Sequence, residues 1–115
     1  MSEVRYRDTR MMEFQEDTRF PGIGIKLLET RSTHPSASVI IARVAPGGTI
    51  PAHTHPVETE TAFVLSGQGK LITDIGEYIF EPGVMVTIPA GLAHHVVNTG
   101  ATPLEIFAFH NPPTR

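Results

Sequence analysis

Turns are so frequent in this chain that they leave little room for helices. Ten glycines and ten prolines are spread over 115 residues, and they fall between short apolar runs. No stretch keeps the apolar spacing of an amphipathic helix over three turns. Short β-branched or apolar runs bounded by turn residues are typical of strands. The sequence therefore predicts an all-β fold of about nine short strands, a sandwich or barrel for which a jelly-roll is the natural arrangement.

The expected strands follow from these runs. Apart from the segment that carries the histidines described below, they are residues 24–29, 38–44, 60–65, 70–73, 77–80, 84–88, 93–98 and 104–110. Asp74, Ile75 and Gly76 lie between two of these strands and predict a tight hairpin.

Composition narrows the class of protein. With 40% hydrophobic and 18% charged residues, the chain is expected to form one globular domain. A net charge of −3 without a cluster of Lys or Arg gives no electrostatic case for a nucleic-acid partner. No run is long enough to span a membrane, and the N-terminus lacks the apolar core of a signal peptide, so we expect a cytoplasmic protein. The absence of cysteine excludes thiolate catalysis and thiolate metal sites.

The N-terminal segment differs from the rest of the chain. Residues 1–19 are strongly charged, whereas residues 20–115 carry the apolar runs expected of the barrel. The segment is either loosely ordered or adds residues 4–7 as a strand to the sheet edge of a neighbouring subunit, and terminal position favours the first alternative.

Three histidines and a glutamate stand out in residues 47–98. His53 and His55 are two residues apart, so on an extended strand they point to the same face, and Glu60 follows. If His94 points inward, Val96 and Asn98 do so too, whereas His95 and Val97 face the other way. Three imidazoles and a carboxylate can form the coordination shell of one divalent metal ion, which we expect to be held by His53, His55, Glu60 and His94.

The spacing of these residues resembles that of a known superfamily. The pattern G-x5-H-x-H-x4-E-x6-G is matched by Gly47, His53, His55, Glu60 and Gly67. The pattern G-x5-P-x-G-x2-H-x3-N is matched by Gly83, Pro89, Gly91, His94 and Asn98. Together the two patterns resemble the paired motifs of the cupin superfamily, in particular its small single-domain members with one conserved barrel. The resemblance implies a double-stranded β-helix, which is the jelly-roll barrel of cupins.

Other interpretations of the polar residues remain open. The histidines and Glu60 form either a metal site or a hydrogen-bonded polar cluster, and the cost of burying them without a partner charge favours the metal. A metal bound there is expected to be Mn, Fe, Co, Ni or Zn, and the ligand set does not choose among them. His34 and His110 are assigned ordinary surface or packing roles. Three phenylalanines are expected in the core or at a subunit interface: Phe63, Phe107 and Phe109. Three polar side chains on strands could reach the cavity: Arg43, Tyr78 and Thr87.

The resemblance implies two classes of function. The first is a metal-dependent enzyme, of dioxygenase, isomerase or lyase type, that acts on a small oxygen-bearing molecule; no catalytic acid or base can be assigned. The alternative is a non-catalytic module that binds or senses a small ligand. An intact ligand set favours the enzyme. Apolar outward positions in residues 62–65 predict a homodimer, because exposed apolar surface is normally covered.

Overall fold

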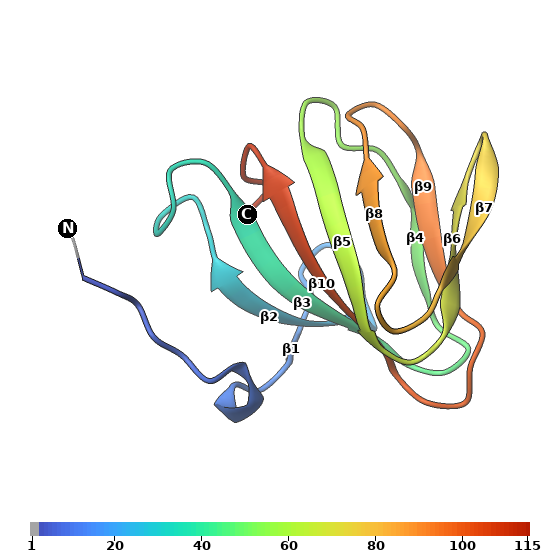
Figure 1. Ribbon diagram of the computed structural model, residues 1–115, viewed down its shortest axis with the longest axis horizontal. Helices are drawn as coiled ribbons and strands as arrows, with labels where there is room; N and C mark the ends of the chain where they lie inside the picture. The colour runs from blue at the N-terminus through green and yellow to red at the C-terminus, as the bar shows by residue number, and fades with distance from the viewer. Residues whose placement is uncertain (1–2) are drawn as a thin grey trace.

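The computed structural model describes residues 3–115 and contains two sheets that face each other (Figure 1). The larger sheet has the order β1-β2-β3-β10-β5-β8 and the smaller the order β4-β9-β6-β7. In the larger sheet the strands are β1 (Gln15–Glu16), β2 (Gly24–Glu29), β3 (Ser38–Val44), β10 (Leu104–Asn111), β5 (Thr59–Ser66) and β8 (Met85–Ile88). In the smaller sheet they are β4 (Thr49–His53), β9 (His94–Asn98), β6 (Gly69–Thr73) and β7 (Gly76–Phe80).

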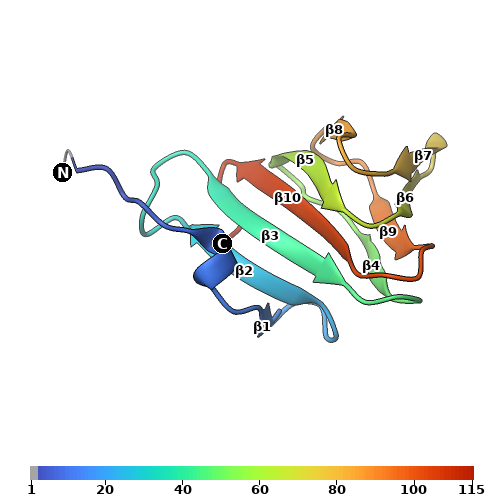
Figure 2. The same ribbon diagram turned by 60° about the horizontal axis from the view of Figure 1, so that its bottom comes forward.

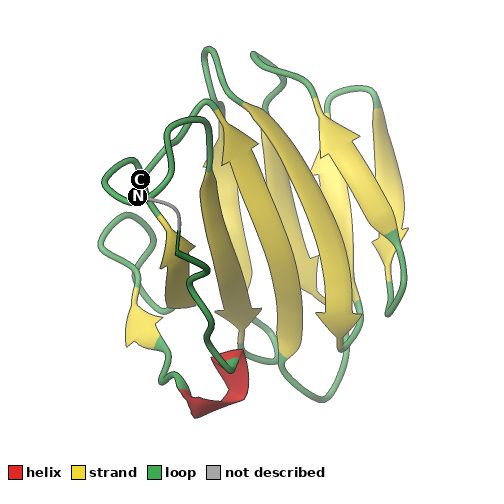
Figure 3. Ribbon diagram, turned by 60° about the vertical axis from the view of Figure 1, so that its left-hand side comes forward, coloured by secondary structure: helices red, strands yellow, loops and turns green. Residues whose placement is uncertain are grey.

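The all-β prediction is confirmed. Between residues 3 and 115 the single helical element is η1 (Thr9–Met11), a short 3₁₀ turn (Figure 3). Each of the eight strands listed from the sequence is present, with its ends displaced by no more than one residue. The hairpin between β6 and β7 is also present, and its turn is formed by Asp74 and Ile75 because Gly76 already belongs to β7.

The hydrophobic core lies between the two sheets. Alternate residues of each strand point inward, so β5 buries Ala62 and Val64 while Phe63 and Leu65 remain exposed on the outer face. Val44, Val64 and Leu104 are completely buried. Burial of such side chains stabilises the fold by about 1.5–3 kcal/mol each.

Glycines allow the turns that connect the motif strands. The four glycines that match the two motifs all have positive φ: Gly47, Gly67, Gly83 and Gly91. Gly67 has a second constraint, because a Cβ at this position would lie 2.4 Å from the carbonyl oxygen of Pro103. Close approach of the two backbones therefore excludes any side chain there.

The N-terminal segment lies against the larger sheet over part of its length (Figure 2). Gln15 and Glu16 form β1, an antiparallel addition to β2 beyond the expected strands. Asp17 is buried and forms a bidentate ion pair with Arg115, whose two terminal guanidinium nitrogens lie 2.6 and 3.0 Å from the two carboxylate oxygens. The addition of residues 4–7 to a neighbouring subunit stays a prediction. No helix within residues 3–115 is long and apolar enough to cross a membrane.

Candidate metal centre

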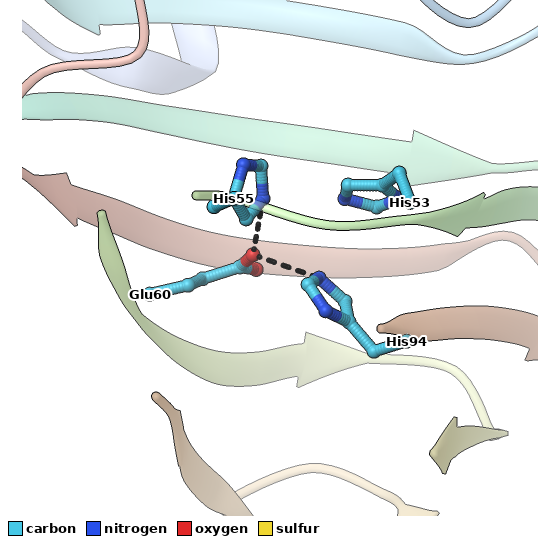
Figure 4. Close-up of side chains that lie close together, drawn as sticks. All are labelled: His53, His55, Glu60 and His94. Carbon is cyan, nitrogen blue, oxygen red and sulfur yellow. Dashed lines mark ion pairs between the residues drawn. The ribbon is translucent and has the colours of Figure 1, made fainter. Parts of the chain in front are cut away.

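Four side chains from separate parts of the motif converge inside the barrel (Figure 4). One candidate ligand atom from each of His53, His55, Glu60 and His94 lies within 4.8 Å of all the others. His53 ends β4, His55 lies in the loop that follows, Glu60 is on β5, and His94 begins β9. The structure thus brings together all four residues that the sequence singles out.

Strand pairing explains this convergence. β4 and β9 are antiparallel neighbours, and their register places His53 opposite His94. The loop that carries His55 is held to the second motif, because the backbone N–H of Gly91 donates to the carbonyl of His55 at 2.8 Å. Glu60 points inward from the opposite sheet with the same parity as Ala62 and Val64.

The predicted parity of β9 is confirmed. His94, Val96 and Asn98 are buried, whereas His95 and Val97 are partly exposed on the other face. Asn98 lies at the opposite end of β9 from His94. Its amide N donates to the carbonyls of Val44 and Thr102 at 3.0 and 2.9 Å, so it links the end of β3 to the loop between β9 and β10.

Backbone carbonyls orient two of the imidazoles. His53 Nδ1–H donates to Pro51 O at 2.8 Å, and His94 Nδ1–H donates to Leu92 O at 2.9 Å. Each bond places the ring proton on Nδ1 and leaves Nε2 with a lone pair. This arrangement is typical of metal-binding histidines, in which the second nitrogen fixes the ring.

Unpartnered nitrogen atoms test whether these residues fit a metal ion. Within residues 3–115, the Nε2 atoms of His55 and His94 are buried and have no hydrogen-bond partner. They lie 3.3 and 3.4 Å from Glu60 Oε1 (Figure 4). Because buried polar atoms are normally paired, these orphaned nitrogens beside a carboxylate fit the need for a cation between them.

His110 also lies beside this cluster, which the sequence analysis does not predict. Its position at the end of an expected strand predicts only a surface or packing role for His110. It is instead 4% exposed and points into the barrel, with Nε2 3.1 Å from Glu60 Oε1. Alternation along residues 104–110 places His110 on the same face as buried Leu104 and Ile106, so the strand pattern contained a signal for this position.

The charges of the cluster are coupled. Burial opposes ionisation of Glu60, but the neighbouring imidazoles, His110 foremost, outweigh it and hold the pKa of Glu60 well below its usual range. Burial lowers the pKa of His53, which favours its neutral form. For His94, burial acts in the same direction, but the Glu60 carboxylate and the Leu92 carbonyl outweigh it and raise the pKa. An ionised Glu60 and a neutral His53 are in the protonation states that metal binding requires.

The cluster opens into a pocket with mainly apolar walls. Phe20 covers one side of the site, with its ring centroid 4.8 Å from that of His53. Asp17, Arg19 and Arg115 also line this pocket. Arg43, Tyr78 and Thr87 do not line it and are exposed, and His34 lies in a polar loop as expected. Phe63 and Phe109 are partly exposed on the outer face of the larger sheet.

Comparison with protein families decides the classification. Residues 40–110, which include both motifs, match the model of the cupin domain family. This chain is a cupin. The resemblance inferred from the two motifs is therefore confirmed for the family and for its fold.

This cupin is similar in sequence to plant proteins and similar in fold to a bacterial protein. Germin-like protein 2-4 of Oryza sativa subsp. japonica is 31% identical over 85% of this chain and 46% of the relative. Germin-like protein 1 of Brassica napus is 40% identical over 52% of this chain and 31% of the relative. The chain thus spans less than half the length of these curated relatives. A predicted oxalate decarboxylase from Thermotoga maritima has a similar fold, with a TM-score of 0.84, 20% identity, and coverage of 94% of this chain and 99% of the other.

Proposed function

We propose that this cupin is a metal-dependent enzyme that acts on a small oxygen-bearing molecule, with His53, His55, Glu60 and His94 as the ligands of one divalent ion. The observation that carries the proposal is the convergence of the four side chains to within 4.8 Å at a pocket with mainly apolar walls. Mn²⁺, Fe²⁺, Co²⁺ and Ni²⁺ suit nitrogen and oxygen ligands, as does Zn²⁺ at lower coordination number.

The chain would hold such an ion with three imidazoles and one carboxylate. When bound, the metal ion supplies Lewis acidity and open coordination positions for a substrate oxygen or a water molecule. The carbonyls of Pro51 and Leu92 fix the rings of His53 and His94, so those nitrogens need little reorganisation. Phe20 and the apolar walls limit the access of water to the site.

The net charge of the metal site and its pocket supports an anionic or enolisable substrate. A divalent cation together with Glu60 carries one net positive charge, which favours a carboxylate, an enolate or a hydroxy-keto group. Arg19 and Arg115 also line the pocket; Arg115 forms an ion pair with Asp17, whereas no side-chain ion pair of Arg19 is found among residues 3–115. Small carboxylates such as oxalate, hydroxy acids and keto acids are therefore the first probes to test.

The alternative is a module that binds a small ligand without transforming it. The same pocket would serve this role, since a binder needs only shape and a few polar groups. A set of four metal-ligating residues exceeds that need, and this favours the enzyme. We further propose that the protein forms a homodimer through the outer face of the larger sheet, where Phe63, Leu65, Met85 and Phe109 are exposed.

An assay for product formation distinguishes the enzyme hypothesis from the binding-module hypothesis. The protein is stripped with chelator, reloaded in turn with Mn²⁺, Fe²⁺, Co²⁺, Ni²⁺ and Zn²⁺, and incubated with oxalate and with small hydroxy and keto acids. Oxygen uptake, CO₂ release and NMR of the substrate detect the three expected reaction types. We expect product with at least one metal, its loss in His94→Ala and its retention in His95→Ala. Binding of a probe without any product would favour the binding module.

A further inference from the structure

His110 lies next to the ligand set without belonging to it. β10 pairs with β5, and their register places His110 directly opposite Glu60. The His110 side chain is 5% exposed, and its Nε2 lies 3.1 Å from Glu60 Oε1. The cluster whose candidate ligand atoms are mutually within 4.8 Å contains His53, His55, Glu60 and His94 but not His110. His110 therefore contacts the carboxylate from outside the coordination shell.

The neighbours of Glu60 differ in what they can donate. His55 and His94 also approach Oε1, but both are ligand candidates whose Nε2 must be free of its proton to bind a metal. His94 Nδ1–H already donates to Leu92 O, which keeps its Nε2 as a lone pair. His110 is under no such requirement, so it is the imidazole beside Glu60 that can supply an N–H.

The other ring nitrogen of His110 supports this tautomer. Nδ1 is buried and has no hydrogen-bond partner within residues 3–115. A proton on Nδ1 would be a buried donor without an acceptor, whereas a proton on Nε2 faces a carboxylate oxygen. Because unpaired buried N–H groups are rarer than unpaired buried acceptors, the proton belongs on Nε2.

We propose that His110 is a positioning residue of the metal centre: its Nε2–H donates to Glu60 and holds the carboxylate in the orientation that ligation requires. This inference rests on the metal site proposed above and adds a residue that lies outside both motifs. Hydrogen bonds from outside the shell orient ligating carboxylates, and their loss typically costs 10- to 100-fold in metal affinity. Because β5 and β10 are paired, the backbones of Glu60 and His110 are held next to each other, and His110 can support Glu60 rigidly.

Substitution of His110 by two amides of different side-chain length tests this role. In His110→Gln the side-chain amide N can occupy the position of Nε2, whereas in His110→Asn it reaches only the position of Nδ1. We expect His110→Gln to retain Mn²⁺ affinity within about threefold and His110→Asn to lose about 10- to 100-fold, measured by competition with a chelator of known affinity. The visible absorption bands of the Co²⁺-loaded protein should be preserved in the first variant and shifted in the second. His95→Asn, on the outer face of β9, is the matched control and should bind as the wild type does.

Each remaining outcome contradicts the inference in a distinguishable way. Equal affinities in His110→Gln, His110→Asn and the wild type would show that Glu60 needs no support. Equal losses in both variants would assign the effect to the shape of the imidazole ring rather than to its N–H. If His110→Asn does not fold, His110→Met, which also has no donor at the position of Nε2, takes its place, and the same loss of Mn²⁺ affinity and the same shift of the Co²⁺ bands are expected of it. A wild-type protein that binds neither Mn²⁺ nor Co²⁺ would overturn the metal centre itself, and this inference with it.

Discussion

His53 and His94 face each other across β4 and β9, with ring centroids 4.4 Å apart, although they belong to different motifs. Each ring is held by a bond from Nδ1 to a carbonyl two residues earlier in the chain. The two halves of the site are therefore built in the same way and brought together by one strand pairing. Loss of either ring should have the same consequence.

Removing one of these imidazoles should weaken metal binding and lower stability together. We expect His53→Ala and His94→Ala to bind metal at least about tenfold more weakly, because one of four ligands is lost. At saturating metal a tenfold loss of affinity removes about 1.4 kcal/mol of stabilisation, so the melting temperature should fall with metal occupancy. Elemental analysis and thermal melts measure the two quantities. His95→Ala is the control, and unchanged occupancy in both ligand variants would refute the assignment.

Gly67 should tolerate substitution far less well than Gly47. Both have positive φ, of 86° and 75°, so alanine strains the backbone at either position. At Gly67 the added Cβ would also meet Pro103 O at 2.4 Å, whereas nothing lies within 4 Å of it at Gly47. We expect Gly47→Ala to cost about 1 kcal/mol and Gly67→Ala more than about 3 kcal/mol, measured by urea denaturation. Equal costs at the two positions would contradict the close approach of the Gly67 and Pro103 backbones.

The ion pair of Asp17 and Arg115 should make stability depend on pH in the acid range. Burial raises the pKa of Asp17, but Arg115 and the backbone N–H of Arg19 outweigh it and lower the pKa below 3.8. A carboxyl with a lowered pKa in the folded state contributes stability that is complete above its unfolded pKa of about 3.9 and is lost as the pH falls through the folded value. The difference in unfolding free energy between the wild type and Asp17→Asn should therefore be constant from pH 7 to pH 5 and shrink below about pH 4. A difference that grows on acidification would have the wrong sign for this account.

The outer face of the larger sheet should mediate dimerisation. Phe63 on β5 is 41% exposed and Met85 on β8 is 63% exposed, and the register places them side by side. We expect a dimer by light scattering at micromolar concentration, and a monomer in Phe63→Glu, because a buried charge without a partner opposes association. Ile79→Glu is the control, since Ile79 is 67% exposed on β7 in the other sheet. A wild-type monomer would rule out this interface.

Local patterns in the sequence predict the strands and the all-β class, and the resemblance to cupins implies the double-stranded β-helix and links the two motifs. Alternation along β9 predicts that His94 and His95 face opposite ways, and the spacing of the second cupin motif selects His94 as the inward one. Turn residues fixed the ends of most strands to within one residue. These features depend on neighbours in the sequence, which is why they could be read without a structure.

Contacts between distant parts of the chain were not predictable in the same way. His110 reaches Glu60 only because β10 pairs with β5, and no local pattern specifies that pairing. The ion pair of Asp17 and Arg115 likewise joins residues 98 positions apart in the chain. In both cases the partner of a polar residue is set by tertiary contacts between distant segments, so the sequence alone predicts only an ordinary surface or packing role for His110.

The metal content of the purified protein tests the central claim most directly. The protein should be prepared without chelator and without a metal-affinity column, then analysed by elemental mass spectrometry. The account predicts close to one Mn, Fe, Co, Ni or Zn per chain, since three histidines and one glutamate form a single shell. A protein that is isolated without metal and also fails to take up any of these ions when they are added would contradict it.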